Sequence, residues 1–150
     1  MMTNKELVLE TLKRSGRMIA QSIQDKSPTM TGTELNNESD YIPSFVAACN
    51  KMNMLERPVG FICKSSAGRI VKLLQNYDST IYTSEPEELP AQWGFVWSDD
   101  PKHALPFVAI STSPYMKGNC CSEDGLIYKS TIDNNVWSPK AYSQGWELVK

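Results

Sequence analysis

An internal repeat constrains this 150-residue chain more than any other feature. Each copy has a glycine before an apolar segment, a second glycine before another apolar segment, a proline, and a tryptophan that begins a third. The first copy comprises residues 60–63 (GFIC), 68–72 (GRIVK), Pro86 and 93–96 (WGFV), and the second comprises 118–121 (GNCC), 125–129 (GLIYK), Pro139 and 146–149 (WELV). The interval from proline to tryptophan is the same in both copies. This agreement in order and spacing favours duplication of one structural unit over chance similarity.

Each copy has the sequence pattern of a small β module. In the first copy, residues 59–64 and 69–75 are β-prone and flank the polar residues 65–68. The last of these is a glycine, which suits the positive φ that a hairpin turn requires. A lone hairpin leaves one face open to water, so a third strand that carries a tryptophan is expected to cover that face.

The tryptophans that recur in both copies, Trp93 and Trp146, are therefore predicted core residues. Cys63 and Cys121 occupy matching strand positions and are predicted to join them as small buried hydrophobic residues. The predicted fold class is α+β, mainly β, with an N-terminal helix followed by two small antiparallel three-stranded β modules.

Residues 4–24 are predicted to form an amphipathic helix, with Asn4 as its N-cap. A stripe at four-three spacing is formed by Val8, Leu12, Ser15, Ile19 and Ser22. The stripe is too short to predict a stable coiled coil in isolation. We therefore expect the helix to dock on its own domain or on a neighbouring subunit, and assign it to anchoring or oligomerisation.

Composition suggests where the chain divides. Residues 25–37 are rich in Ser, Pro, Thr, Gly and Asn and have no hydrophobic periodicity, which is typical of a linker. Pro43 argues against a long helix or a central strand in the segment that follows. The expected organisation is an N-terminal helix at 1–25, a linker and connecting segment at 26–57, a first diverged β module at 58–110, and a second β module at 111–150.

Charge and hydropathy exclude several classes of partner. The formal net charge is -2 and basic residues are scattered, so nucleic acid is not an expected partner. No apolar run approaches the length of a membrane span, and none near the N-terminus has the form of a signal-peptide core. The four cysteines have no Cys-x-x-Cys spacing and the single histidine, His103, is far from most of them, so neither a zinc site nor a cofactor is expected.

No catalytic constellation is recognisable, and the chain is predicted not to be an enzyme. His103 follows a run of turn formers, where a histidine is usually solvated. Glu85, Glu87 and Glu88 could mimic the paired carboxylates of a glycosidase, but acids clustered around a proline are usually a solvated surface. Phosphate-binding, nucleophile-elbow and zinc-protease motifs are absent from the sequence.

The C-terminal thirty residues resemble a known family. Residues 126–129 (LIYK), 137–139 (WSP), Tyr142 and 145–149 (GWELV) are similar to carbohydrate-binding modules of the chitin-binding type, families 5 and 12, which occur in bacterial chitinases and in phage structural proteins. The first copy looks like a diverged version of the same module. It has Ser84 where the second copy has a tryptophan, which favours an architectural role for it.

The resemblance implies a set of carbohydrate-binding residues in the second module. Trp137 is expected as an exposed ring on which a sugar stacks, with the remaining candidates nearby: Tyr142, Tyr128, Asn134, Asn135 and Gln144. The alternative for Trp137 is a ring folded over the hairpin, or buried against the other copy or another subunit.

Taken whole, the chain resembles virion structural proteins of phages that infect Gram-positive bacteria. The resemblance implies a non-enzymatic fibre, tail or capsid appendage, made in the host cytoplasm and located in the virion. Its expected partners are other virion proteins, further copies of itself and a host-surface glycan. The alternative is a free-standing accessory module that binds polysaccharide, and a third reading is an enzyme subunit.

Overall fold

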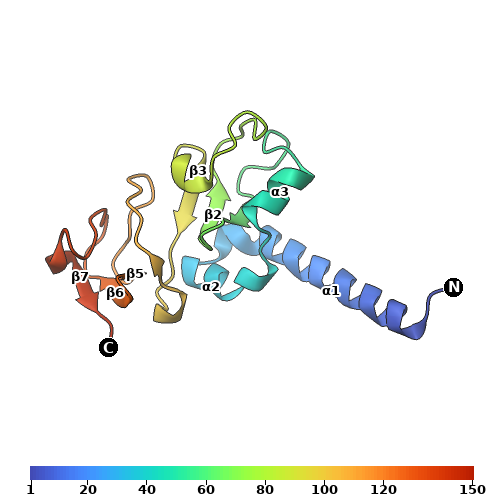
Figure 1. Cartoon of the computed structure of the whole chain (residues 1–150), viewed down its shortest axis with the longest axis horizontal. Coiled ribbons are helices and arrows are strands. Elements are labelled where there is room, and N and C mark those ends of the chain that lie inside the picture. The colour runs from blue at the N-terminus through green and yellow to red at the C-terminus, as the bar shows by residue number, and fades with distance from the viewer.

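The structure, a computed structural model, describes all 150 residues and is α+β, mainly β. Helices occupy the N-terminal third, and two β-sheets follow (Figure 1). The α-helices are α1 (Asn4–Lys26), α2 (Gly32–Asn37) and α3 (Phe45–Lys51). The strands are β1 (Ile62–Lys64), β2 (Ile70–Leu73), β3 (Trp93–Val96), β4 (Leu105–Pro106), β5 (Cys120–Glu123), β6 (Leu126–Ser130) and β7 (Trp146–Leu148). The short 3-10 helices are η1 (Ser27–Thr29), η2 (Ser39–Tyr41), η3 (Pro86–Glu88), η4 (Pro101–His103) and η5 (Ser143–Gly145).

Helix α1 begins with a capping box. Its N-cap is Thr3, one residue before the predicted Asn4. The Glu6 backbone N–H donates to Thr3 Oγ1 at 3.1 Å, and the Thr3 backbone N–H donates to Glu6 Oε2 at 2.8 Å. This reciprocal pair satisfies two donors that a helix start otherwise leaves free, so the helix has a defined beginning.

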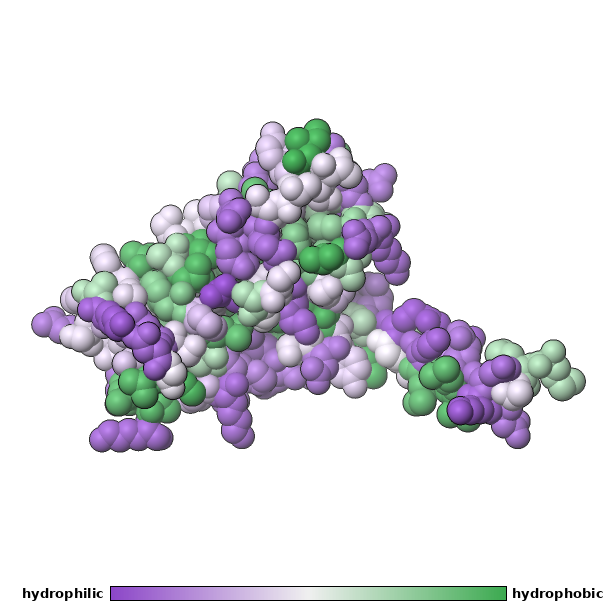
Figure 2. Space-filling model, viewed as in Figure 1, coloured by the Kyte–Doolittle hydropathy of each residue, from purple (hydrophilic) through white to green (hydrophobic).

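Only the C-terminal end of α1 is attached to the rest of the molecule. Ile23 is its one buried residue. The Gln24 side chain accepts from the backbone N–H of Ile62 at 2.9 Å and donates to the Ile62 carbonyl at 2.6 Å, which covers the free edge of β1. The N-terminal part projects away from the body (Figure 1), and Figure 2 shows hydrophobic side chains exposed along it.

The segment predicted as a linker is in fact folded. Thr31 and Glu34 form a second capping box at the start of α2, and Leu35 is fully buried. Leu35 packs with Ile23, Ile42, Ile62 and Ile70 in one hydrophobic cluster. The linker prediction is wrong because the Ser and Thr residues of this segment act as helix caps, and α2 is too short to show a periodic pattern.

The first sheet has the predicted antiparallel order β1-β2-β3. Cys63 pairs with Val71, and Val71 pairs with Phe95. Gly68 has φ of +87° in the turn between β1 and β2, a conformation that glycine adopts without strain. Trp93 is fully buried in the larger core cluster, and its Nε1–H donates to the Tyr77 hydroxyl at 3.0 Å.

The second sheet repeats the register of the first. Cys121 pairs with Tyr128 and Tyr128 with Leu148, as Cys63, Val71 and Phe95 do in the first copy. Equivalent hydrogen bonds recur: the Gly60 N–H donates to the Leu73 carbonyl at 2.8 Å, and the Gly118 N–H donates to the Ser130 carbonyl at 2.9 Å. Gly60 and Gly118 have nearly the same φ, +98° and +97°. The two modules therefore share one backbone plan.

The second sheet has four strands, not the predicted three. The additional strand is β4, which runs parallel to β5 with Leu105 opposite Cys121. The predicted domain bounds place residues 105–106 in the first module, yet these residues complete the second sheet. The expected boundary at residue 110 thus cuts through a segment that belongs to both modules.

Aromatic rings join the two modules into one interior. Trp97, just after β3, stacks on Phe95 at 5.6 Å between centroids and on Tyr115 at 4.2 Å. Tyr115 in turn stacks on Phe107 at 5.3 Å and meets Trp146 edge-on. Trp97 packs against the core clusters of both modules. The copies are therefore packed together, and the first does not act as a tether for the second.

The cysteines are free thiols in hydrophobic surroundings. Cys63 and Cys121 are fully buried, and Cys120 is also buried. Burial raises the pKa of Cys121 to about 12 and also raises the pKa values of Cys49 and Cys120. The thiolate, which is the reactive form, is therefore scarce in the native protein at neutral pH.

We expect dithiobisnitrobenzoate to react with the native protein at least about tenfold more slowly than with the denatured chain, because the thiols are buried and protonated. Absorbance of the released thiolate measures the rate. Cys49 is only half-buried and should react first, so the variant Cys49→Ser should lack the earliest phase. Rapid labelling of all four thiols in the native protein would contradict the buried placement.

Candidate ligand groove in the second module

A surface groove in the second module is lined by two exposed aromatic rings. Trp137 is 50% exposed and Tyr142 is 38% exposed, whereas the recurring tryptophan of this module, Trp146, is 6% exposed. The Trp137 and Tyr142 rings lie 5.6 Å apart between centroids at an interplanar angle of 65°. The groove has a volume of about 640 Å³, and its other lining residues are Ile132, Asp133, Asn134 and Ala141.

The buried side chain of Asn135 organises the loop that presents these rings. Its Nδ2 group donates to Ser130 Oγ at 3.1 Å and to the Gly145 carbonyl at 3.0 Å, and its Oδ1 accepts from the Trp137 backbone N–H at 3.3 Å. Its backbone pairs with Tyr115 in an isolated bridge. Asn135 thus ties both ends of the loop to β6 and to the stack of aromatic rings.

The residues around Trp137 and Tyr142 limit the freedom of this loop further. Trp146 Nε1–H donates to the Trp137 carbonyl at 2.8 Å, so the buried tryptophan holds the backbone of the exposed one. The Tyr142 N–H donates to the Ser138 carbonyl at 2.9 Å, which closes a turn. A Cβ at Gly145 would lie 2.8 Å from the Tyr142 ring, so glycine permits the ring to pack there. The two rings are therefore held in place before any ligand binds.

Two polar side chains also line the groove. Asp133 Oδ1 accepts from the Lys117 backbone N–H at 3.0 Å, which orients the carboxylate. Asn134 is exposed and adopts the left-handed backbone conformation, with φ of +55°. A pair of aromatic faces with a carboxylate and an amide beside them suits a ring-shaped ligand that carries hydroxyl groups.

The structure brings together only some of the residues predicted for carbohydrate binding. Trp137, Tyr142 and Asn134 line one groove. Asn135 is fully buried and its amide is used internally, so it is a structural residue and cannot contact a ligand. Tyr128 is half-buried and packs against the cluster that contains Cys121.

Gln144 is exposed but does not line the groove. Its carbonyl accepts from Thr131 Oγ1 at 2.9 Å, which is a contact within the loop. The residues that the sequence prediction of the site missed are Ile132, Asp133 and Ala141. Asp133 belongs to an Asp-Asn-Asn turn sequence, and that turn chemistry is the one signal that could have indicated its position.

The first module lacks this groove because both rings are replaced. Ser84 stands at the position of Trp137, and Leu89 stands at the position of Tyr142. The second equivalence is supported by a matching hydrogen bond: the Gln92 N–H donates to the Leu89 carbonyl, and the Gly145 N–H donates to the Tyr142 carbonyl. Leu89 packs against the core cluster of the first module. The surface that presents rings in one copy is therefore covered by aliphatic packing in the other.

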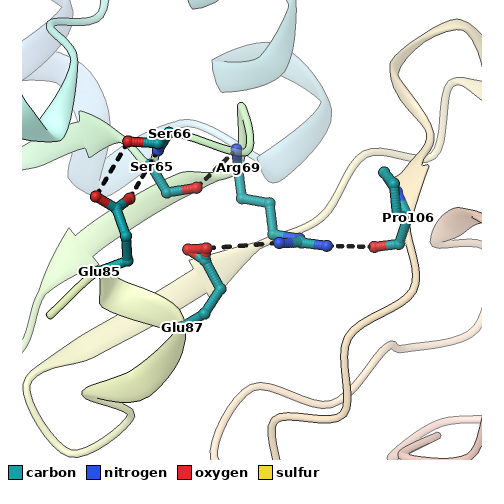
Figure 3. A network of polar contacts seen from close by, with 6 residues as sticks. All are labelled: Ser65, Ser66, Arg69, Glu85, Glu87 and Pro106. Carbon is teal, nitrogen blue, oxygen red and sulfur yellow. Dashed lines mark hydrogen bonds and ion pairs between the residues drawn. The ribbon is translucent and has the colours of Figure 1, made fainter.

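The acidic residues of the first module have structural partners. Glu85 accepts from the Ser66 backbone N–H at 2.8 Å and from the Ser66 hydroxyl at 3.0 Å. Glu87 pairs with Arg69, which is itself buried (Figure 3). These carboxylates hold the β1–β2 turn against η3 and do not face each other across a cleft.

No cluster of three or more His, Cys, Asp or Glu side chains has an arrangement that could hold a metal ion. None of the helices combines the length and the hydropathy needed to cross a bilayer. Comparison with protein-family models, with curated proteins and with solved structures gives no match for this chain.

Proposed function

We propose that the protein is a non-enzymatic structural component of a phage particle, and that its C-terminal module binds a glycan of the host surface through the groove of Trp137 and Tyr142. The assignment to a phage particle rests on the resemblance of the sequence. The glycan rests on one observation: this module exposes two aromatic rings on a loop that buried hydrogen bonds hold in place.

Physical chemistry supports a carbohydrate as the ligand. The exposed rings of Trp137 and Tyr142 offer apolar area to the C–H face of a pyranose, and a preformed site reduces the entropic cost of binding. Asp133 and Asn134 also line the groove and can exchange hydrogen bonds with sugar hydroxyls. The site is open and has only two aromatic rings, so we expect a single groove to bind a glycan weakly.

The alternative is a free-standing accessory module that binds polysaccharide. The same groove would serve that role. The projecting helix α1 favours the structural component, because a free-standing module gains nothing from an exposed apolar helix that joins the body at its C-terminal end, through residues such as Ile23 and Gln24.

We expect the variant Trp137→Ala to weaken glycan binding about tenfold or more, which equals a loss of about 1.4 kcal/mol or more. Isothermal titration calorimetry with chito-oligosaccharides and with Gram-positive cell-wall fragments measures the change. Trp137 donates and accepts its hydrogen bonds through the backbone, so the variant should remain folded. The matched control is Tyr82→Ala, which removes another exposed ring, 58% exposed, in the first module.

Unchanged binding by Trp137→Ala would contradict the placement of the site, as would an equal loss in Tyr82→Ala. No binding of either glycan by the wild-type protein would remove the support for a carbohydrate. The architecture and the structural role of α1 would be unaffected by that result.

A further inference from the structure

A polar pocket lies where the first module meets the segment that leads to β4. Its volume is about 470 Å³. It is lined by Ser44, the N-cap of α3, by Lys64 and Ser65 at the end of β1, and by Lys102 and His103 of η4. Only two of its eleven lining residues are hydrophobic. The pocket therefore suits a small hydrophilic ligand and offers little contact to an apolar one.

The titratable groups that line this pocket are all basic. They are the ammonium groups of Lys64 and Lys102 and the imidazole of His103, and no carboxylate is among the lining residues. None of these three side chains forms an ion pair within the chain. A pocket with this charge attracts an anion and repels a cation.

Lys64 is held in a fixed position at the pocket. Its side chain is half-buried, and its Nζ donates to the Ser39 carbonyl at 2.9 Å. Its backbone N–H donates to the Pro43 carbonyl, also at 2.9 Å. The ammonium group has three N–H donors, so two remain for a ligand. A partly buried charge is costly unless an opposite charge balances it, and the chain supplies none to Lys64.

Two serine hydroxyls add further donors to the pocket. Ser65 is 3% exposed, and its Oγ accepts from the Arg69 backbone N–H at 3.2 Å. Ser44 Oγ accepts from the Ala47 backbone N–H at 3.2 Å. Neither hydroxyl donates to another atom of the chain. Each O–H group is therefore free to donate to an acceptor in the pocket.

The acidic residues that contact the lining residues bind backbone N–H groups and do not line the pocket themselves. Asp100 Oδ1 accepts from the Lys102 backbone N–H at 3.0 Å. Glu85 accepts from the backbone N–H and the hydroxyl of Ser66 (Figure 3). Ser66 is thus engaged elsewhere, whereas the ammonium groups, the imidazole and the hydroxyls of Ser44 and Ser65 remain for a ligand.

We propose that this pocket binds a phosphate group, either as inorganic phosphate or as the phosphate of a small ester. A phosphate group carries a charge of about −1.5 to −2 at neutral pH and several strong acceptor oxygens. These oxygens match two ammonium groups, an imidazole and two hydroxyls that donate from different segments. A carboxylate has one charge and two oxygens, so it would leave more of these donors without an acceptor.

This site goes beyond the proposed function and does not depend on glycan binding. None of its lining residues lines the groove of Trp137 and Tyr142. Its lining residues come from the connecting segment, the first module and the segment that leads to β4, whereas the Trp137 groove belongs to the C-terminal loop. The chain would therefore have two separate binding sites.

The first test is titration of the isotopically labelled full chain with sodium phosphate, followed by backbone amide chemical shifts at constant ionic strength. We expect saturable shifts at Ser65 and His103 and no shift at Trp137. A second titration uses glycerol 3-phosphate. Tighter binding of the ester identifies a substituted phosphate as the ligand, and tighter binding of inorganic phosphate identifies the ion alone. Either result supports a phosphate site.

The second test is a charge reversal at the pocket. Lys102→Glu should weaken phosphate binding about tenfold or more, because it replaces an attraction by a repulsion. Lys102 is exposed and its hydrogen bond to Asp100 uses the backbone, so the variant should remain folded. His103→Gln should weaken binding severalfold. The matched control is Lys117→Glu, which makes the same charge change at an exposed residue of the second module and should have an effect of about twofold or less.

Absence of saturable shifts at Ser65 and His103 with both phosphate compounds would overturn the site, as would shifts confined to residues outside the pocket. Equal losses in Lys102→Glu and Lys117→Glu would also overturn it, because they would show attraction to the net charge alone. Calorimetry with glycans on Lys102→Glu keeps the two proposals apart, since glycan binding should equal that of the wild type whether or not phosphate binds.

Discussion

Replacement of Trp93 by alanine is expected to lower the free energy of unfolding by about 3–5 kcal/mol, the usual cost of removing a buried aromatic side chain. Trp93 is completely buried between Phe45 and Tyr77, with ring centroids 5.8 and 6.2 Å away, both in edge-on geometry. The variant also leaves the buried Tyr77 hydroxyl without its hydrogen-bond partner. Urea unfolding followed by circular dichroism measures the loss.

The chain provides its own controls for this measurement. Trp146 occupies the equivalent position of the second module, and Trp146→Ala should cost about the same 3–5 kcal/mol. Trp137 is half exposed, and Trp137→Ala should cost about 1 kcal/mol or less, because little of its area is withdrawn from water. Equal losses for Trp93→Ala and Trp137→Ala would contradict the division between core and surface tryptophans.

The second large effect is expected at Arg69. Its Nη1 group lies 3.5 Å from Glu87 Oε2, and its Nη2 group donates to the Pro106 carbonyl at 2.6 Å (Figure 3). The side chains of Arg69 and Glu87 are only 9% and 16% exposed. Arg69→Ala leaves the Glu87 carboxylate buried without a partner, so we expect a loss of about 3–5 kcal/mol.

A double variant distinguishes the cost of an unpaired charge from the value of the pair. Arg69 Nε and Glu87 Oε1 are buried without a hydrogen-bond partner, so the pair is imperfectly satisfied. Arg69→Met/Glu87→Leu should therefore recover most of the stability that Arg69→Ala loses. If Arg69→Ala has no effect on urea unfolding, or if the double variant is worse than it, the pair does not act as we infer.

Loss of Arg69 should also loosen the contact between the modules. Arg69 precedes β2 of the first sheet, whereas Pro106 belongs to β4 of the second. This hydrogen bond is one polar link between the two sheets, and the stacking of Trp97 on Tyr115 is an aromatic link. The duplicated modules are thus stabilised as a pair.

Local chemistry made much of the fold predictable. Each glycine turn with β-prone residues on both sides specifies a hairpin, because the turn sets the register and the register sets which side chains share a face. Comparison of the two copies then separated a tryptophan present in both from one present in a single copy. In the structure Trp93 and Trp146, which recur in both copies, are buried, whereas Trp137, which occurs only in the second copy, is exposed.

Fewer residues of the candidate site could be predicted from the sequence. Trp137 and Tyr142 lie on one loop, and their proximity follows from short sequence separation. Asn135 is chemically suited to bind a sugar, and only its distant partners Ser130, Gly145 and Tyr115 show that its polar groups are used internally. Tyr128 is also chemically suited to bind a sugar, because it has an aromatic ring and a hydroxyl group. In the structure its side chain packs against the hydrophobic cluster that contains Cys121.

The sequence by itself therefore determined the duplication, the hairpins and the two classes of tryptophan, because turn formers and alternating apolar residues act over a few positions. Only the tertiary structure decided that residues 26–57 are folded, that β4 joins the second sheet, and that Asn135 is buried. Each of these depends on contacts between residues far apart in the chain. A polar or short segment takes its conformation from such partners, since its own hydrogen-bonding groups can be satisfied by water or by protein equally well.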